Sequence, residues 1–165
     1  MNSNVIFRAL IAYLAFGASL GIAGPYALAS ESRSQGQLVY IPANSHILEG
    51  DRERKFNLSV TLSIRNRDSD TALDVLKVDY FDQDGQLVRQ YVDSPVRLRP
   101  MSSTYFFIKE SDIAGGIGAS FLVRWKSDKP VNSPLIEAIM ISARSQQGIS
   151  FVSRGIVIKE LQSRK

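Results

Sequence analysis

Hydrophobic and polar residues alternate strictly along residues 56–64. The apolar positions are Phe56, Leu58, Val60, Leu62 and Ile64, and the polar positions between them are Asn57, Ser59, Thr61 and Ser63. Successive side chains of an extended chain point to opposite faces, so this pattern predicts a β-strand with one face in a core and the other in water. The polar face has no charge before Arg65, and it is the first surface on which we expect a partner, unless another strand covers it.

Shorter runs of strand-forming residues, separated by turn residues, lie on both sides of this segment. They cover residues 37–41, 73–82, 87–92, 96–98, 104–108, 119–125, 135–143 and 149–158. No amphipathic helix of ten residues or more follows residue 29. The pattern predicts an all-β fold, a single antiparallel β-sandwich of the immunoglobulin-like kind with about eight strands, with a small β-barrel as the alternative.

Two local features make more specific predictions about the strands. Asp84-Gly85 is typical of a two-residue type I′ hairpin turn, and counting outward from it places Val78 opposite Tyr91. Hydrophobic parity switches at Gly155, which predicts a glycine bulge that turns the last strand over.

The connection over residues 126–134 also makes a prediction, because counting inward from its two ends pairs the flanking strands. Arg124 would lie across from Glu137, and Trp125, in the core with Phe121 and Val123, across from Ile136. An arginine opposite Glu137 would offset the cost of a carboxylate on a mostly apolar strand.

The N-terminal residues have the pattern of a secretory signal peptide. Arg8 precedes an apolar run from Ala9 to Ala23, and Ala27-Leu28-Ala29 has small residues at the two positions that a signal peptidase reads. We expect export with cleavage after Ala29; the alternative is an uncleaved anchor. The chain then divides into a signal peptide (1–29), a tail (30–36), one β domain (37–160) and a short C-terminal tail (161–165).

Composition adds limits on function. The chain has 20 Lys and Arg against 16 Asp and Glu, and only Arg8 lies in the signal segment, so the mature charge is 19 − 16 = +3. The charges are interspersed, which favours an ordinary soluble surface over nucleic-acid binding. The absence of cysteine excludes a disulfide framework, a thiolate metal site and a lipid-modified cysteine.

Four segments resemble a known family. They are Val39-Tyr40-Ile41-Pro42-Ala43-Asn44-Ser45-His46-Ile47, residues 58–66, Trp125-Lys126-Ser127-Asp128-Lys129-Pro130-Val131-Asn132, and residues 146–155. Together they resemble an exported bacterial family labelled domain of unknown function 3124, over most of residues 37–158. The resemblance implies export and one small domain. It implies no catalytic or binding residue, because the family has no known activity.

Candidate site residues are few. His46, the only histidine, could act as a base or metal ligand, but a structural role with its ring nitrogens bonded to loop backbone is favoured. Arg144 and Arg154 flank the turn that contains Gln146 and Gln147, and these four residues are the other binding candidates. We expect structural roles for Arg124, Trp125, Glu137, Asp84, Gly85 and Gly155.

For the other motifs, a structural role is favoured over a functional one. A carboxylate pair could be drawn from Asp79, Asp82, Glu110, Asp112 and Glu137, yet most of these lie in predicted turns or on solvent faces. The Gly115-Gly116-Ile117-Gly118 segment is read as a flexible loop, and a calcium loop at residues 82–85 is less favoured than the hairpin. Tyr105, Phe106 and Phe107 could stack on a sugar or peptide, but such aromatic residues are more often core.

The sequence therefore favours an exported, non-enzymatic binding or envelope-associated domain. Its partner would be an envelope or periplasmic protein or a glycan. We expect no nucleic acid, metal or cofactor to bind. The chain would contact a membrane only through the signal segment, if that segment is not cleaved. The location would be periplasmic or extracellular. The alternative is a hydrolase of envelope polysaccharide or peptide that uses His46 or a carboxylate pair. A cleft that gathers His46 with two carboxylates would favour the enzyme, and an exposed apolar patch or free sheet edge would favour binding.

Overall fold

The computed structural model describes residues 33–144 and 147–161. The predicted signal peptide over 1–29 and the ends of both predicted tails, residues 30–32 and 162–165, lie outside this part. Within the described residues no helix is long and apolar enough to cross a membrane. The same residues form these strands: β1 (Ser34–Pro42), β2 (His46–Glu49), β3 (Arg54–Asn57), β4 (Ser59–Arg65), β5 (Leu73–Phe81), β6 (Leu87–Gln90), β7 (Val96–Leu98), β8 (Ser103–Ile108), β9 (Ser120–Val131), β10 (Leu135–Arg144), β11 (Gln147–Arg154) and β12 (Ile156–Glu160).

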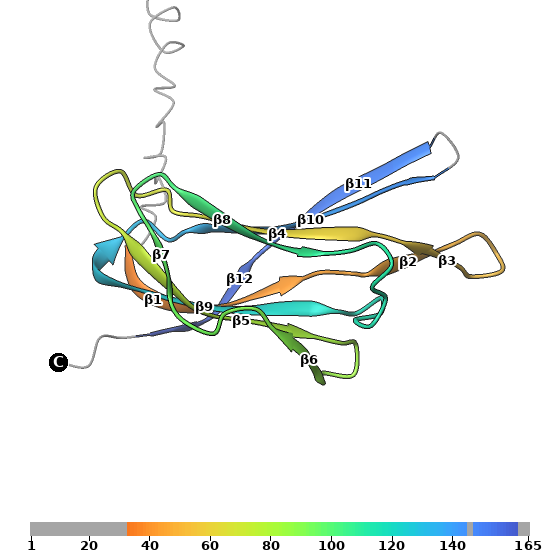
Figure 1. Ribbon diagram of the computed structural model, residues 1–165, viewed down its shortest axis with the longest axis horizontal. Coiled ribbons are helices and arrows are strands. Elements are labelled where there is room, and N and C mark those ends of the chain that lie inside the picture. Colours follow the sequence, from red (N-terminus) through yellow and green to blue (C-terminus); the bar gives the residue numbers. More distant parts are fainter. Residues whose placement is uncertain (1–32, 145–146, 162–165) are drawn as a thin grey trace, which may run out of the picture. The chain divides into compact units, whose positions relative to one another are not determined.

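The strands form two antiparallel sheets in a sandwich-like arrangement, as the sequence predicts. One sheet has the order β12-β1-β9-β5-β6, with β7 also paired to β5, and the other has the order β11-β10-β4-β8. Strands β2 and β3 form a separate hairpin. Neither sheet closes on itself, so the barrel alternative is wrong. Figure 1 shows the two layers edge-on, with β4, β8 and β10 above β1, β9 and β5.

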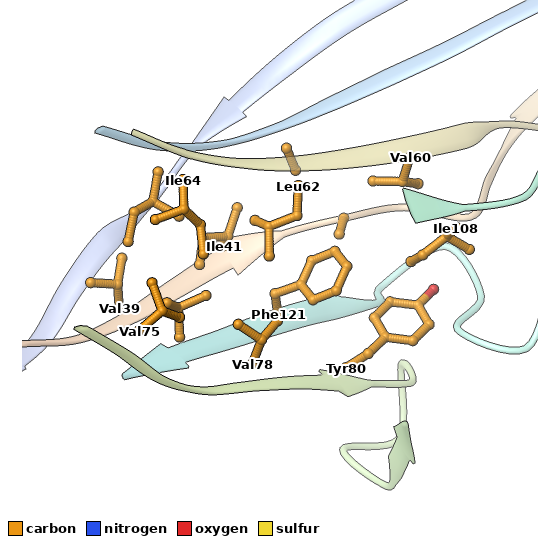
Figure 2. Close-up of a cluster of buried hydrophobic side chains, with 14 of the residues drawn as sticks. Val39, Ile41, Val60, Leu62, Ile64, Val75, Val78, Tyr80, Ile108 and Phe121 are labelled. Atoms are coloured by element: carbon orange, nitrogen blue, oxygen red, sulfur yellow. The ribbon is translucent and has the colours of Figure 1, made fainter. Parts of the chain in front are cut away.

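The core lies between these two layers. Val60, Leu62 and Ile64 of β4 are fully buried, and Figure 2 shows them facing side chains of the other sheet, including Ile41, Val78 and Phe121. The alternation along residues 56–64 therefore predicted the buried face correctly. It did not predict the break at Leu58, where the chain leaves the β2–β3 hairpin and enters β4. The Leu58 N–H donates to the Ser45 carbonyl there, so the backbone stays bonded across the break.

The hairpin after β5 is confirmed, with a different turn. The Tyr91 N–H donates to the Val78 carbonyl at 2.9 Å, so these two residues are opposite each other as predicted. Gly85 has a φ of 76°, but Asp84 does not have positive φ, so the turn is not type I′. Instead, the Asp82 carboxylate accepts hydrogen bonds from the N–H groups of Asp84 and Gln86, at 3.0 and 2.8 Å. These two bonds hold the longer loop in place.

The predicted pairing of Arg124 with Glu137, and of Trp125 with Ile136, is wrong. Strand β9 pairs with β1 and β5, whereas β10 pairs with β4 and β11, so the two strands lie in different sheets. Strand β9 also continues to Val131, through most of the predicted loop. Counting inward fails because the connection crosses between the layers and is not a hairpin. Trp125 is fully buried with Phe121 and Val123, as predicted.

Gly155 is the point at which the chain passes from one sheet to the other. Strand β11 ends at Arg154 on the edge of the four-stranded sheet, and β12 begins at Ile156 on the edge of the larger sheet. A Cβ at Gly155 would lie 2.6 Å from Val39 Cγ1 and 3.2 Å from Ile41 Cγ1. The predicted glycine bulge is therefore wrong: residue 155 lies at a change of sheet, and Ile156 and Ile158 after it are 61% and 56% exposed. The irregularity in β12 lies nearer its end, opposite Leu38 and Val39.

A polar network closes the end of the sandwich at which β4 ends and β5 begins. The Asp68 carboxylate accepts the backbone N–H groups of Asp70, Thr71 and Asn132, at 3.1, 2.9 and 3.1 Å, and Arg33 Nη2 at 3.2 Å. Asn66 donates its side-chain amide to the carbonyls of three residues, Thr71, Leu98 and Arg99. The bond from the Asn132 N–H, followed by that from Asp70, lowers the pKa of Asp68 to about 2.

We expect Gly155→Ala to destabilise the fold, because the new Cβ would collide with core side chains. Overpacking of this kind costs about 1–3 kcal/mol in the free energy of unfolding. Gly148→Ala is the matched control, since a Cβ at Gly148 meets nothing within 4 Å, and its effect should stay within about 0.5 kcal/mol. Urea denaturation of the two variants measures the difference. Equal stabilities would contradict the close approach at the sheet crossing.

We expect Asp68→Asn to lower the melting temperature clearly more than Asp70→Asn, because an amide places a donor against backbone N–H groups that need an acceptor. A lowered carboxyl pKa stabilises the folded state above the unfolded value of 3.8, and this contribution disappears as pH falls toward 2. The difference in melting temperature between wild type and Asp68→Asn should therefore become smaller as pH is lowered from about 5 to about 2. A difference that is unchanged at low pH would show that the ionised carboxylate is not the source.

Candidate functional site

The outward side chains of the four-stranded sheet form one continuous surface, which we call the β4 face. Pairing in register places Val152, Ile139, Thr61 and Phe107 in a row across β11, β10, β4 and β8. The next row contains Arg154, Glu137, Ser63 and Tyr105, and Ile141 lies beside Ser59 on the other side. Strand spacing makes this surface about 14 Å wide.

Large apolar side chains are exposed on the β4 face. Tyr105 is 70% exposed, Val152 54%, and Phe107 and Ile141 slightly less than half. Ile139, at the centre, is half-buried. Within the described residues no other strand covers this face. Ser59 and Thr61 are half-buried and Ser63 is buried by its neighbours on the same sheet, so the expected polar stripe is narrow and bordered by apolar side chains.

An ion pair lies at one edge of the β4 face. Arg154 Nε donates to Glu137 Oε1 at 3.1 Å, and the two residues are directly opposite each other in β11 and β10. The carboxylate on the apolar strand is thus paired, as predicted, but with Arg154 in place of Arg124. Glu137 is largely covered while Arg154 is well exposed, so the guanidinium keeps donors available to a ligand.

Arg154 also borders a cleft of about 280 Å³ at the crossing between the two sheets. The cleft has an apolar floor that includes Val39, Ile136 and Val157, and Gln37 and Arg67 lie at its sides. Gln37 and Arg67 are occupied within the protein, because Gln37 Nε2 donates to Glu160 and Arg67 Nε donates to the Ser133 carbonyl. Of the predicted binding candidates, Arg154 is the one placed beside both the β4 face and a cleft.

Arg144 and Gln147, two further predicted candidates, lie at the far end of the β10–β11 pairing. Gln146 lies outside the described residues, as do the side chains of Arg144 and Gln147, whose backbones pair in register. Arg144 is seven residues along β10 from Glu137, the partner of Arg154. Seven residues of strand span roughly 24 Å, so Arg144 and Arg154 do not form one basic patch.

His46 is buried at the start of β2 and is only 6% exposed. Its Nδ1 has no hydrogen-bond partner in the described part of the chain, so the predicted bond from this nitrogen to loop backbone is wrong. Burial, followed by the positive charge of Lys55, lowers the pKa of His46 below its ordinary value of 6.5. The ring is therefore neutral at neutral pH and is covered from solvent.

The glycine segment before β9 packs closely over the same end of the core. The Gly116 carbonyl accepts hydrogen bonds from the backbone N–H and the hydroxyl of Ser45, at 3.0 and 3.1 Å. A Cβ at Gly115 would overlap the Tyr80 ring, so the segment needs glycine for contact with the core. Gly116 has a φ of 78°. The prediction of a loop is correct, but this loop is held in place by bonds to residue 45.

The carboxylates considered for hydrolysis are engaged in structural interactions. Asp79 pairs with Lys77 at 2.7 Å and Asp112 with Arg89 at 2.9 Å. Glu110 accepts a weak bond from Ser142 at 3.4 Å. Across residues 33–144 and 147–161, no three histidine or acidic side chains gather closely enough to hold a metal ion.

Sequence reasoning missed most of the β4 face. Tyr105 and Phe107 were grouped with Phe106 as core, although alternation within β8 puts Phe106 and Ile108 on one side and Tyr105 and Phe107 on the other. The apolar residues on both faces of residues 135–143 indicated a central strand, and β10 is central. Apolar residues on both faces of this strand also indicate that some of them, here Ile139 and Ile141, point to the surface.

Comparison with known proteins places the chain in a family. The model of the family described as "Protein of unknown function (DUF3124)" matches residues 36–158. The chain belongs to this family. No curated protein matches it. Its fold is similar to a solved structure titled "Crystal Structure of Thermotoga maritima 1070", with 13% sequence identity and a TM-score of 0.44, over 76% of this chain and 97% of that one.

We expect the stability of the protein to fall as pH drops from about 7.5 to about 5.5, with His46 as the source. A lowered histidine pKa means that the unfolded chain binds the proton more readily, so acid favours unfolding below the ordinary value of 6.5. Because His46 is the only histidine in the chain, His46→Gln should remove this dependence. Urea denaturation across this pH range provides the measurement, and an unchanged slope in the variant would contradict the assignment.

Proposed function

We propose that this protein is an exported, non-enzymatic binding domain that recognises an envelope protein through the β4 face. The signal pattern in its first 29 residues supports export with cleavage after Ala29, into a periplasm or beyond the cell. The observation that carries the binding role is the group of exposed Tyr105, Phe107, Ile141 and Val152 side chains on one flat sheet face.

The make-up of the β4 face supports a protein partner. Interfaces combine an apolar, aromatic centre with polar groups at the rim, and Tyr and Arg are enriched in them. On this face Ile139 lies on a central strand, Phe107 and Tyr105 lie on the edge strand β8, and the Arg154–Glu137 pair lies toward the opposite edge. Monomeric proteins rarely leave such contiguous apolar patches on the surface without a function.

The position of His46 favours binding over hydrolysis. A hydrolase with His46 as base would need this ring open to substrate and near a carboxylate, and the ring is buried. The carboxylates Asp79, Asp112 and Glu137 each pair with a cation. Cleavage of an envelope glycan or peptide that is lost in His46→Gln, with the fold intact, would reverse this ranking.

Photo-crosslinking in the producing cell tests the proposal. A benzophenone amino acid replaces Phe107 or Val152 on the β4 face in separate variants, and Asp84, on the exposed β5–β6 turn, is the control position. We expect a defined protein adduct from positions 107 and 152 and none from position 84. Adducts of equal yield at position 84, or none from the β4 face, would overturn the proposal.

The crosslinked partner then allows a quantitative test. Tyr105→Ser together with Phe107→Ser should weaken binding by at least about tenfold, since aromatic side chains are common hot spots of protein interfaces. Leu87→Ser with Met101→Ser is the matched control, because it removes two exposed apolar side chains elsewhere. Both double variants should melt near the wild-type temperature. Equal loss of binding in the two would show that general surface hydrophobicity is responsible.

A further inference from the structure

The outer face of the larger sheet has a different chemistry from the β4 face. Along β9, Val123 and Trp125 point into the core, so Arg124 and Lys126 point outward. Register places Lys77 of β5 directly opposite Arg124 on one side. On the other side Leu38 of β1 is opposite Arg124, and Lys159 of β12 follows. Lys77, Arg124 and Lys159 therefore lie in one row that runs across four strands.

This row is only partly balanced by acidic side chains. Like charges directly opposite each other on neighbouring strands are destabilising, and Arg124 faces Lys77 in this way. Lys77 is paired with Asp79, but the described residues give no hydrogen bond or ion pair to Arg124, Lys126 or Lys159.

Within the described residues, the other acidic side chains near this row form no ion pair with Arg124, Lys126 or Lys159. Glu160 is turned toward Ser34 and Gln37, with bonds of 2.6 and 2.7 Å, and Asp74 pairs with Arg97. Asp74 is also directly opposite Lys126 in the register, and Asp128 borders the depression beside Lys126.

The sheet is hollowed beside these cations. A depression of about 470 Å³ is bordered by Arg124, Lys126, Ser127, Asp128 and the apolar side chains of Leu76 and Leu161. It lies where the register shifts on both sides of β9, between Val75 and Lys77 in β5 and between Ser34 and Gly36 in β1. Such irregularities bend a sheet locally and redirect side chains.

An exposed apolar row lies next to the cations. Ile156 of β12 is 61% exposed and is opposite Tyr40 of β1, which is 37% exposed and is followed by Leu122 of β9. Val157 and Ile158, also in β12, are about half exposed. In the described part of the chain β12 pairs only with β1, so this hydrophobic strand leaves one backbone edge open. Soluble proteins usually protect such edges with charges or a covering segment.

We infer that this face and the β12 edge dock on a membrane that contains anionic phospholipid. Cations attract a negatively charged lipid surface, while apolar and Tyr side chains beside them enter the boundary between headgroups and acyl chains. Arg124, Lys126 and Lys159 supply the first part and Ile156, Ile158 and Tyr40 the second. A soluble phosphate compound in the depression would use the cations and leave the exposed β12 residues without a role.

Vesicle co-sedimentation of the exported protein tests this inference. Phosphatidylglycerol mixed into phosphatidylcholine should bind the protein, pure phosphatidylcholine should not, and raising salt from about 0.05 M to about 0.5 M should release it. Arg124→Gln with Lys126→Gln should lower binding by about fivefold per cation removed. Arg99→Gln with Lys109→Gln removes the same charge from exposed sites elsewhere and should have little effect.

The apolar contribution is measured separately. Ile156→Ser with Ile158→Ser should weaken binding to the anionic vesicles while the melting temperature stays close to wild type, because both side chains are already exposed. Two results together would assign the site to a soluble phosphate compound instead. Vesicle binding would be unchanged in this variant, and calorimetry would show glycerol 3-phosphate binding that depends on Arg124 and Lys126. Equal losses in the Arg99 and Lys109 control would show non-specific attraction and also overturn the inference. Crosslinking from the β4 face is unaffected by either result.

Discussion

The turn from Asn66 to Thr71 holds the two sheets in their relative positions at one end. Asp68 accepts backbone N–H groups on both sides of this crossing, from Thr71 before β5 and from Asn132 after β9. Asn66 bonds the carbonyls of Leu98 and Arg99 between β7 and β8. Three connections between strands therefore meet at two buried polar side chains. With no cysteine in the chain, this network and the apolar core do the work that disulfides do in many small exported domains.

Fixing both sheets in this way leaves their outer faces free to differ. Residues that point inward are constrained by packing, as Val60, Leu62 and Phe121 illustrate. Residues that point outward on the same strands are not, so β4 and β10 present hydroxyl and apolar side chains while β9 presents Arg124 and Lys126. The alternation that builds the core therefore also separates two surfaces of unlike chemistry on opposite sides of one small domain.

Much of the fold followed from the sequence because the signals concerned were local. Alternation along residues 56–64 predicted the buried face of β4, and the Asp84-Gly85 pair predicted the register of Val78 with Tyr91. The Arg124–Glu137 pairing failed because it depended on whether the connection at residues 126–134 stays within a sheet, and local sequence does not specify that. The apolar part of the β4 face was missed for a similar reason. Exposure of Tyr105 and Phe107 depends on the absence of a third layer over β8, which is a property of the whole fold.

The crossing at Gly155 connects the two surfaces through one short segment. Arg154, just before it, lies on the β4 face, and Ile156, just after it, lies on the face that carries the cations. Space for the crossing exists only because residue 155 has no side chain where Val39 and Ile41 approach. The parity switch read from the sequence at this glycine thus marks a change of sheet and not a bulge within one strand. The crossing ends one sheet and starts the edge of the other, and it places the surfaces proposed for a protein partner and for a lipid membrane on opposite faces of the domain.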